Sequence, residues 1–170
     1  MTAQAFRRLF FALWPDETIQ RQLAEVARQL ARDSQGKPIP SHNIHTTLAF
    51  LGDVADDAVS ELSKLAADRG DFSCELVLDR VASFSRGVVY AAPTESPREL
   101  LEVAADLKRT LRERGFAIDL RPFVPHITLV RNARRSAKWT SIGPVTWTVR
   151  GVRLVQSELQ SSGAIYHLVG

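Results

Sequence analysis

Residues 44–52 read Ile-His-Thr-Thr-Leu-Ala-Phe-Leu-Gly, and residues 125–131 read Pro-His-Ile-Thr-Leu-Val-Arg. The tetrapeptide His-x-Thr-Leu begins at the second position of both stretches, and apolar residues follow it each time. Short apolar runs that are bounded by loop-forming residues predict β-strands. We therefore expect two strands that carry the same motif, over residues 44–51 and 125–131.

The spacing within each motif predicts which side chains share a face. In a strand, residues i and i+2 point to the same side, so His45 projects with Thr47 and His126 projects with Thr128. We expect the intervening side chains on the other side, toward a core: Thr46, Leu48, Phe50, Ile127 and Leu129. Each motif would then present one imidazole and one hydroxyl to a common surface.

The segments around the two motifs follow the same order, which is a weak internal repeat. A strand over residues 9–13 leads through a helix to the first motif, and a strand over residues 88–92 leads through a helix to the second. A strand pair follows each motif, within residues 76–90 and 149–166. The sequence therefore predicts an α+β fold of duplicated β-α-β lobes with pseudo-two-fold symmetry, antiparallel sheets lining a central cleft, and helices outside. Residues 1–170 would form one two-lobed domain, in which the motifs meet in the cleft.

Local signals mark the ends of several elements. Asp16 is expected to cap the first helix, and a shorter helix is expected over residues 57–67. Ser96, Pro97 and Glu99 match a capping box and predict the start of a third helix. The remaining expected features are a turn at Gly52-Asp53, strands over residues 72–84 and 88–92 joined by Ser85-Arg86-Gly87, and final strands over residues 145–156 and 164–169.

Composition limits the classes of protein to consider. The chain has 170 residues, a net charge of +3 and a sequence pI of about 9.4, which is compatible with an anionic substrate. Its single cysteine, Cys74, rules out an internal disulfide and is expected to be a small buried side chain. The apolar run at residues 9–13 is too short for a signal peptide, and no segment reaches the roughly 18 apolar residues of a membrane span. We therefore expect a cytoplasmic monomer without membrane association.

Two imidazoles and two hydroxyls in one small volume suit the hydrolysis of a phosphodiester. Water must lose a proton as it attacks phosphorus, while the departing oxygen must gain a proton on the opposite side. Because an imidazole has an ordinary pKa of about 6.5, one histidine can act as base and the other as acid near neutral pH. Threonine hydroxyls can donate hydrogen bonds to the non-bridging oxygens, where charge develops. The residues alone leave open which histidine takes which part.

Residues 44–52 and 125–131 resemble the two signatures of the two-histidine (2H) phosphoesterases. Within that superfamily the chain is most similar to the bacterial and archaeal LigT-type RNA 2′,3′-cyclic phosphodiesterases, also called 2′-5′ RNA ligases. The likeness covers nearly the whole chain, including the N-terminal strand that leads to Pro15-Asp16, the helix order and the motif spacing.

The resemblance implies a reaction and a part for each residue. The expected activity is hydrolysis of 2′,3′-cyclic phosphate at RNA 3′ ends, or on nucleotides, to 2′-phosphomonoesters, without metal or another cofactor. His45 would donate a proton to the leaving 3′ oxygen, and His126 would accept a proton from the attacking water. Thr47, Thr128 and Arg131 would bind the phosphate.

Several alternatives stay open. The same site could act on 2′-5′ linked oligonucleotides or ADP-ribose 1″,2″-cyclic phosphate, or could join tRNA halves reversibly. A non-catalytic module that binds RNA ends and a metallohydrolase are further possibilities. A metal pair of His42 and His45 is a poor one, because residues three apart face opposite ways in a strand, and His42 is expected at the rim of the cleft.

Two further groups of residues have more than one reading. The basic segment with Arg134, Arg135 and Lys138 is either a solvated loop or a track for RNA phosphates. Aromatic residues near the motifs could stack on a base, but each is expected in the core: Phe11, Trp14, Phe84 and Phe123. His167 is expected to be an ordinary strand residue.

Overall fold

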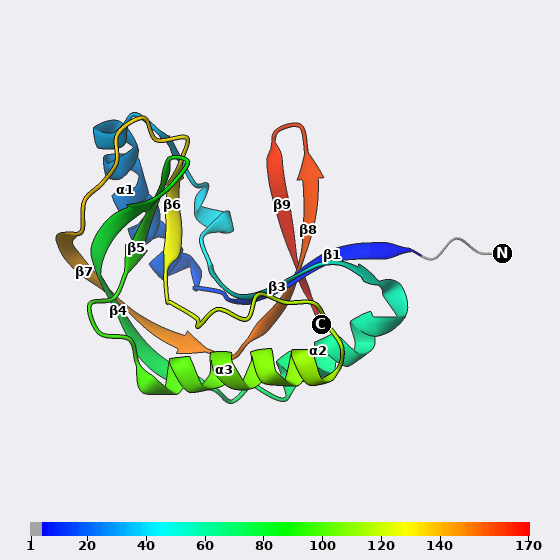
Figure 1. The fold of residues 1–170 in the computed structure, drawn as a ribbon. Coiled ribbons are helices and arrows are strands. Elements are labelled where there is room, and N and C mark those ends of the chain that lie inside the picture. The colour runs from blue at the N-terminus through cyan, green and yellow to red at the C-terminus, as the bar shows by residue number, and fades with distance from the viewer. Residues whose placement is uncertain (1–4) are drawn as a thin grey trace.

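Two antiparallel sheets and three α-helices make up residues 5–170, the part of the chain that the computed structural model describes (Figure 1). The strands are β1 (Phe6–Leu13), β2 (Lys37–Pro38), β3 (Thr46–Ala55), β4 (Ser73–Phe84), β5 (Val88–Ala92), β6 (Ile127–Arg131), β7 (Thr140–Arg150), β8 (Arg153–Gln160) and β9 (Gly163–Val169). The helices are α1 (Glu17–Ser34), α2 (Val59–Ala67) and α3 (Arg98–Glu113), with short 3-10 turns η1 (Ser41–Asn43) and η2 (Asp56–Ala58).

The order of strands confirms the predicted duplication. The first sheet has the order β3-β1-β8-β9, and the second has the order β2-β6-β5-β4-β7. Apart from the short strand β2, the two orders correspond strand by strand, with each motif strand (β3 or β6) beside the strand that precedes its helix (β1 or β5). All pairs are antiparallel. The predicted α+β fold with two related sheets is therefore correct.

The two halves of the chain exchange elements. Strand β4 follows the first motif but lies in the second sheet, and β8 follows the second motif but lies in the first sheet. The helices cross over in the same way, since α1 packs against β6 and β2 while α3 packs against β3. Each sheet therefore needs both halves of the chain, and the two motifs are held at a fixed distance from each other.

Helix α1 forms where local signals and burial agree. Asp16 is the N-cap, and its carboxylate accepts a hydrogen bond of 2.9 Å from the backbone N–H of Ile19, as its sequence position predicted. The buried stripe of the helix follows the 3.6-residue repeat and includes Leu23 and Ala27. Gln20 also lies on this stripe, and its side-chain amide donates to the carbonyl oxygen of Ile44, one residue before His45.

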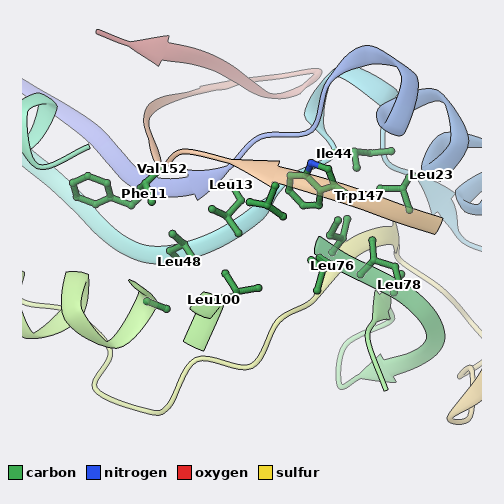
Figure 2. Close-up of a cluster of buried hydrophobic side chains, with 14 of the residues drawn as sticks. Phe11, Leu13, Leu23, Ile44, Leu48, Leu76, Leu78, Leu100, Trp147 and Val152 are labelled. Atoms are coloured by element: carbon green, nitrogen blue, oxygen red, sulfur yellow. The ribbon is translucent and has the colours of Figure 1, made fainter. Parts of the chain in front are cut away.

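A single core joins the two sheets and the helices. Trp147 of β7 is 2% exposed and lies among side chains from both sheets, including Leu13 of β1 and Leu76 of β4, while Phe11 lies farther along the same cluster (Figure 2). Full burial of a leucine-sized side chain contributes roughly 1.5–3 kcal/mol to stability. Because most of this apolar surface is shared between the sheets, they stabilise each other.

Both motif strands carry a β-bulge at the leucine of His-x-Thr-Leu. Along β1 and β3, Phe11 pairs with Ala49 and Ala12 pairs with Thr47, so Leu48 is skipped. Along β5 and β6, Val89 pairs with Val130 and Tyr90 pairs with Thr128, so Leu129 is skipped. A bulge opposes two residues of one strand to one of its partner and reverses the alternation beyond it.

This bulge corrects one prediction about the first motif. Strict alternation placed Phe50 on the core side, away from Thr47. Instead Leu48 and Ala49 are both buried, and Phe50 is 45% exposed on the side of His45 and Thr47. The equivalent shift in β6 buries Leu129 and Val130 and turns Arg131 to the side of Thr128.

Three local predictions are wrong. Helix α3 is capped by Pro97, whose ψ of 132° lies outside the helix, so Ser96 is one residue too far away to cap it. The expected turn at Gly52-Asp53 is absorbed into β3, which runs to Ala55 with a further register shift beside Gly52. The expected strand over residues 145–156 is two strands, β7 and β8, which separate at Gly151.

Other predicted elements are confirmed with small shifts at their ends. The strands expected over residues 72–84 and 88–92 are β4 and β5, and Arg86 and Gly87 between them have positive φ values of 64° and 70°. Within residues 5–170, no helix is both long and apolar enough to cross a membrane.

Gly151 is the point where the chain leaves the second sheet for the first. Its φ is +63°, and a Cβ there would lie 3.1 Å from the carbonyl oxygen of Gly70. We predict that Gly151→Ala lowers the free energy of unfolding by about 1–2 kcal/mol, because a left-handed backbone is unfavourable for alanine. Urea unfolding monitored by tryptophan fluorescence measures the change.

Gly143 of β7 provides the control for this substitution. It does not have a positive φ, and a Cβ there would meet no atom within 4 Å. Gly143→Ala should leave stability unchanged or slightly raised, because alanine loses less chain entropy on folding. Equal stability of the two variants would contradict the strain assigned to Gly151.

Candidate active site

The two motifs line one cleft of about 740 Å³. All five residues singled out in the sequence lie on its wall: His45 and Thr47 from the first motif, and His126, Thr128 and Arg131 from the second. The predicted meeting of two segments 81 residues apart therefore occurs. The remaining wall comes mainly from β1, the segment around η1, and the hairpin of β8 and β9, through Arg8, Phe10, Ile39, Pro40, His42, Asn43, Phe50, Ser157, Leu159, Ser162, Gly163, Ala164, Ile165 and Tyr166.

His45 is held by two hydrogen bonds in the plane of its ring. Its Nδ1 lies 2.7 Å from the carbonyl oxygen of Asn43, and its Nε2 lies 3.1 Å from Oγ1 of Thr47. A carbonyl oxygen can only accept, so Nδ1 carries a hydrogen and donates it. Nε2 is therefore the nitrogen that can gain or lose a proton beside Thr47.

The segment that carries the Asn43 carbonyl oxygen and His45 is itself anchored. The side-chain amide of Asn43 donates to the carbonyl oxygen of Ala164 at 3.1 Å, which ties η1 to β9. The amide of Gln20 donates to the carbonyl oxygen of Ile44 at 3.3 Å, which ties the same segment to α1. His45 is therefore fixed by contacts to both halves of the chain.

Aromatic rings surround His45. The ring of Trp14 lies almost parallel to the imidazole, with centroids 5.1 Å apart and an angle of 6° between the planes. Tyr166 meets the imidazole edge-on at 5.1 Å, and Phe10 lies 5.2 Å away. Such rings restrict the imidazole to one orientation and exclude water from its faces.

This environment sets the charge of His45. Burial lowers its pKa from the ordinary value, and the positive charge of Arg131 acts in the same direction, as would a proton on His126. The hydrogen bond to the carbonyl of Asn43 opposes them by favouring the protonated ring. The net effect is a pKa below the usual 6.5 of histidine, so the free protein holds His45 largely neutral at neutral pH.

His126 repeats the backbone contact of His45 in a more open setting. Its Nδ1 lies 2.9 Å from the carbonyl oxygen of Val124, again two residues earlier in the chain. Phe84 and Tyr90 meet its ring edge-on at 5.1 and 5.7 Å. Nε2 is again the nitrogen left for proton transfer, so the backbone holds the two imidazole rings in the same way.

The residue five positions after each histidine differs between the motifs. In the first motif it is Phe50, whose ring is covered by the guanidinium of Arg8 at 4.8 Å. In the second motif it is Arg131, which is exposed on the cleft wall. The pseudo-symmetric site therefore has an arginine stacked on an aromatic ring at one side and an exposed arginine at the other.

Sequence reasoning missed several of these contributors. Trp14 and Phe84 were placed in the core, but each contacts one of the motif histidines. Trp14 gave no signal, because its place beside His45 follows from the register of β1 and β3, in which Leu13 pairs with Thr46. Gln20 did give a signal, as a polar side chain on the apolar stripe of α1. Tyr166 gave none, since its strand joins the first sheet only in the folded chain.

The other sequence predictions have simpler outcomes. His42 is exposed on η1 at the rim of the cleft, as expected. His167 lies on β9, 3.7 Å from a carboxylate oxygen of Glu158, and does not line the cleft.

Cys74 packs against the core, and burial raises the pKa of its thiol to about 11. Phe11 is fully buried, as predicted, and Phe123 is partly buried.

No group of three His, Cys, Asp or Glu side chains that could hold a metal occurs within residues 5–170.

Comparisons with known proteins agree with this geometry. A model of the 2′-5′ RNA ligase superfamily matches residues 15–160. An RNA 2′,3′-cyclic phosphodiesterase of Escherichia coli K12 is 34% identical over 128 residues, which are 75% of this chain and 73% of that protein. An RNA 2′,3′-cyclic phosphodiesterase of Thermus thermophilus is 30% identical over an alignment of 182 positions that covers 94% of this chain and 86% of that protein.

Solved structures give the same result. The crystal structure of E. coli LigT complexed with 3′-AMP superposes with a TM-score of 0.86, at 28% identity over 98% of this chain and 97% of that chain. Fold, motif positions and sequence similarity thus agree over nearly the whole length. This chain belongs to the 2′-5′ RNA ligase superfamily and is related to its LigT-type phosphoesterases.

Proposed function

We propose that this protein is an RNA 2′,3′-cyclic phosphodiesterase that opens the cyclic phosphate to a 2′-phosphomonoester. The observation that carries the proposal is the pair of equivalent histidines on one cleft, each with Nδ1 bound to a backbone carbonyl two residues earlier and with a threonine two residues later. The E. coli and T. thermophilus relatives are RNA 2′,3′-cyclic phosphodiesterases, which supports the same substrate.

The reaction needs one proton acceptor and one proton donor on opposite sides of phosphorus. In the proposed mechanism, Nε2 of neutral His126 takes a proton from water as the water oxygen attacks phosphorus. The bond from phosphorus to the 3′ oxygen breaks, and protonated His45 gives its Nε2 proton to that oxygen. The product carries a 2′-phosphate and a free 3′ hydroxyl, and exchange of protons with solvent restores both rings.

The charge that develops on the non-bridging oxygens needs donors that are already in place. In the free protein the hydroxyl of Thr47 donates to Nε2 of neutral His45. Once that nitrogen is protonated, the hydroxyls of Thr47 and Thr128 can both donate hydrogen bonds to these oxygens, one from each motif strand. Arg131 supplies a positive charge on the same side as Thr128, because the bulge in β6 turns it into the cleft. We therefore assign these three residues to the phosphate.

Because its pKa is lowered, His45 must gain a proton before it can act as the proton donor. In the free protein, burial and the neighbouring positive charge of Arg131 keep the ring largely neutral. A bound phosphate diester carries a negative charge, and a negative charge beside an imidazole favours the protonated form. Substrate binding would therefore supply the charge that makes His45 an acid.

The first prediction concerns the two histidines. His45→Ala and His126→Ala should each lower kcat by about 10²–10⁴-fold, which is the usual contribution of a general acid or base. The measurement is turnover of an oligonucleotide with a 2′,3′-cyclic phosphate end. The matched control is His167→Ala, whose ring lies outside the cleft, and which should keep full activity. Near-normal activity of either motif variant, at unchanged melting temperature, would contradict the assignment.

The second prediction concerns the protonation of His45. NMR titration of the free protein should find its pKa below 6.5, since burial disfavours the charged ring. Addition of inorganic phosphate should raise that pKa, because the anion favours the imidazolium. A pKa that stays constant as phosphate saturates the cleft would show that the anion does not bind beside His45.

The third prediction concerns the product and the metal requirement. Incubation with a 2′,3′-cyclic-phosphate oligonucleotide should give a 2′-phosphate end, and excess EDTA should not change the rate. Two imidazoles can transfer both protons, so the proposed mechanism has no step that needs a metal ion. A 3′-phosphate product would show that the bond from phosphorus to the 2′ oxygen breaks instead. Loss of activity in EDTA would favour a metallohydrolase.

The alternatives left open by the sequence use the same cleft. A substrate panel of a 2′-5′ linked dinucleotide, ADP-ribose 1″,2″-cyclic phosphate and a 2′,3′-cyclic end separates them by kcat/KM. A protein that binds the cyclic end without turning it over would be an RNA-end-binding module.

The cytoplasmic location and the monomeric state stay predictions from the sequence.

A further inference from the structure

We propose that Lys37, Arg134 and Arg135 extend the cleft into a basic track for the phosphates of an RNA chain, so that the substrate class is an oligonucleotide rather than a free nucleotide. This inference rests on the proposed function and adds the part of the substrate that lies outside the catalytic cleft. The track begins at Arg131, on the cleft wall.

Lys37 lies directly beside Arg131 on the cleft face of the second sheet. In the antiparallel pair of β2 and β6, Lys37 is opposite Arg131 and Pro38 is opposite Val130. Directly opposed residues of antiparallel strands place their side chains on the same face. Ile39, two residues beyond Lys37, lines the cleft, which agrees with this orientation.

The loop after β6 holds Arg134 and Arg135 close to Lys37. Their backbone N–H groups both donate to the carbonyl oxygen of Ser34, at 2.9 and 3.0 Å, and Ser34 is three residues before Lys37. The N–H of Ala133 donates to the carbonyl oxygen of Gly87 at 2.9 Å. The two arginines are therefore attached to a fixed backbone beside α1 and do not sit on a free loop.

Close packing also fixes the segment between α1 and β2. A Cβ at Gly36 would clash with a methyl group of Val130 and would lie 3.0 Å from Cα of Ala133. Backbone that passes this close leaves little freedom for either segment. The backbone that carries these cationic residues is thus closely packed, and it adjoins Arg131 on the cleft wall through the pairing of β2 with β6.

These cations lack carboxylate partners. Within residues 5–170, none of Lys37, Arg131, Arg134 and Arg135 forms an ion pair, and all four are exposed. The sequence from residue 120 to residue 157 contains no aspartate or glutamate. Like charges directly opposite each other in a sheet are destabilising, so Lys37 facing Arg131 weakens this edge of the fold.

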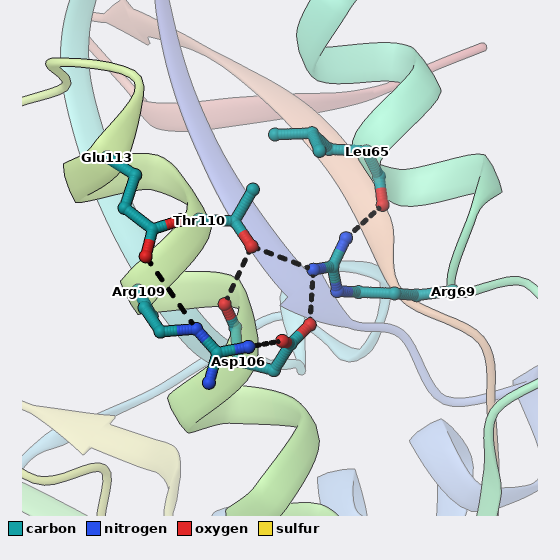
Figure 3. Close-up of polar contacts among 6 residues, drawn as sticks. All are labelled: Leu65, Arg69, Asp106, Arg109, Thr110 and Glu113. Carbon is teal, nitrogen blue, oxygen red and sulfur yellow. Dashed lines mark hydrogen bonds and ion pairs between the residues drawn. The ribbon is translucent and has the colours of Figure 1, made fainter.

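Helix α3 shows a contrasting arrangement, in which carboxylates neutralise neighbouring arginines. Asp106 accepts from both Arg69 and Arg109, and Arg109 also lies 3.9 Å from Glu113 (Figure 3). Charges on that face are largely balanced, whereas those beside the cleft are not. An unbalanced cationic surface that begins at a phosphate-binding arginine matches a polyanion whose first phosphate lies in the cleft.

The experiment compares two substrates in one variant. The triple variant Lys37→Gln, Arg134→Gln, Arg135→Gln keeps every backbone contact of the track and removes three positive charges. We expect kcat/KM for an oligonucleotide of about ten residues with a 2′,3′-cyclic end to fall about 10–100-fold, mostly through KM, with a shallower dependence on salt. Turnover of a 2′,3′-cyclic mononucleotide should stay the same, because a mononucleotide has no further phosphates to reach the track outside the cleft.

A second triple variant removes the same number of charges elsewhere. Arg98→Gln, Arg109→Gln, Arg112→Gln on α3 should leave both substrates unaffected, which separates a local track from general attraction by net charge. The track is refuted if the first variant cleaves the oligonucleotide as well as the natural protein does, or loses mononucleotide turnover to the same extent. Natural protein that cleaves neither substrate would instead overturn the proposed function, and the track with it.

Discussion

The bulged pairing of each motif strand with its neighbour is the constraint on which the site depends. Without the bulge, strict alternation would bury the residue five positions after each histidine, or turn it away from the cleft. Because the pairing skips Leu48 and Leu129, the strand can bury two consecutive apolar side chains and then return to the cleft face. Phe50 and Arg131 reach the site for this reason, and the core keeps the leucines that stabilise it.

The exchange of strands and helices between the halves explains why two distant motifs form one site. Each sheet contains strands from both halves, and each long helix packs on the sheet that does not contain the strand before it. The distance between the motifs is then set by a shared core instead of a hinge. A reaction that requires groups on opposite sides of one phosphorus atom benefits from such rigidity, because small errors in position are costly in rate.

Pseudo-symmetry of the backbone does not extend to the environment of the two histidines. Both rings donate from Nδ1 to a carbonyl two residues earlier, so their tautomers are equivalent. His45, however, is the more buried ring, and burial and Arg131 lower its pKa, while His126 is the more exposed one. The duplicated scaffold thus provides two chemically similar groups with aromatic neighbours, and burial makes them different.

The sequence alone determined the duplication, the motif strands, the start of α1 and the two histidine-threonine pairs, because these depend on local periodicity and on residue types at fixed spacing. Helix α3 was also expected, although its cap is Pro97 and the capping box at Ser96 does not form, since one residue of extended backbone moves the start. Only the tertiary structure decided that Phe50 faces the cleft, that Trp14 and Tyr166 enclose His45, and that Lys37 lies opposite Arg131. Each of these depends on strand register between segments far apart in the chain, and register follows from the packing of the whole core rather than from any local pattern.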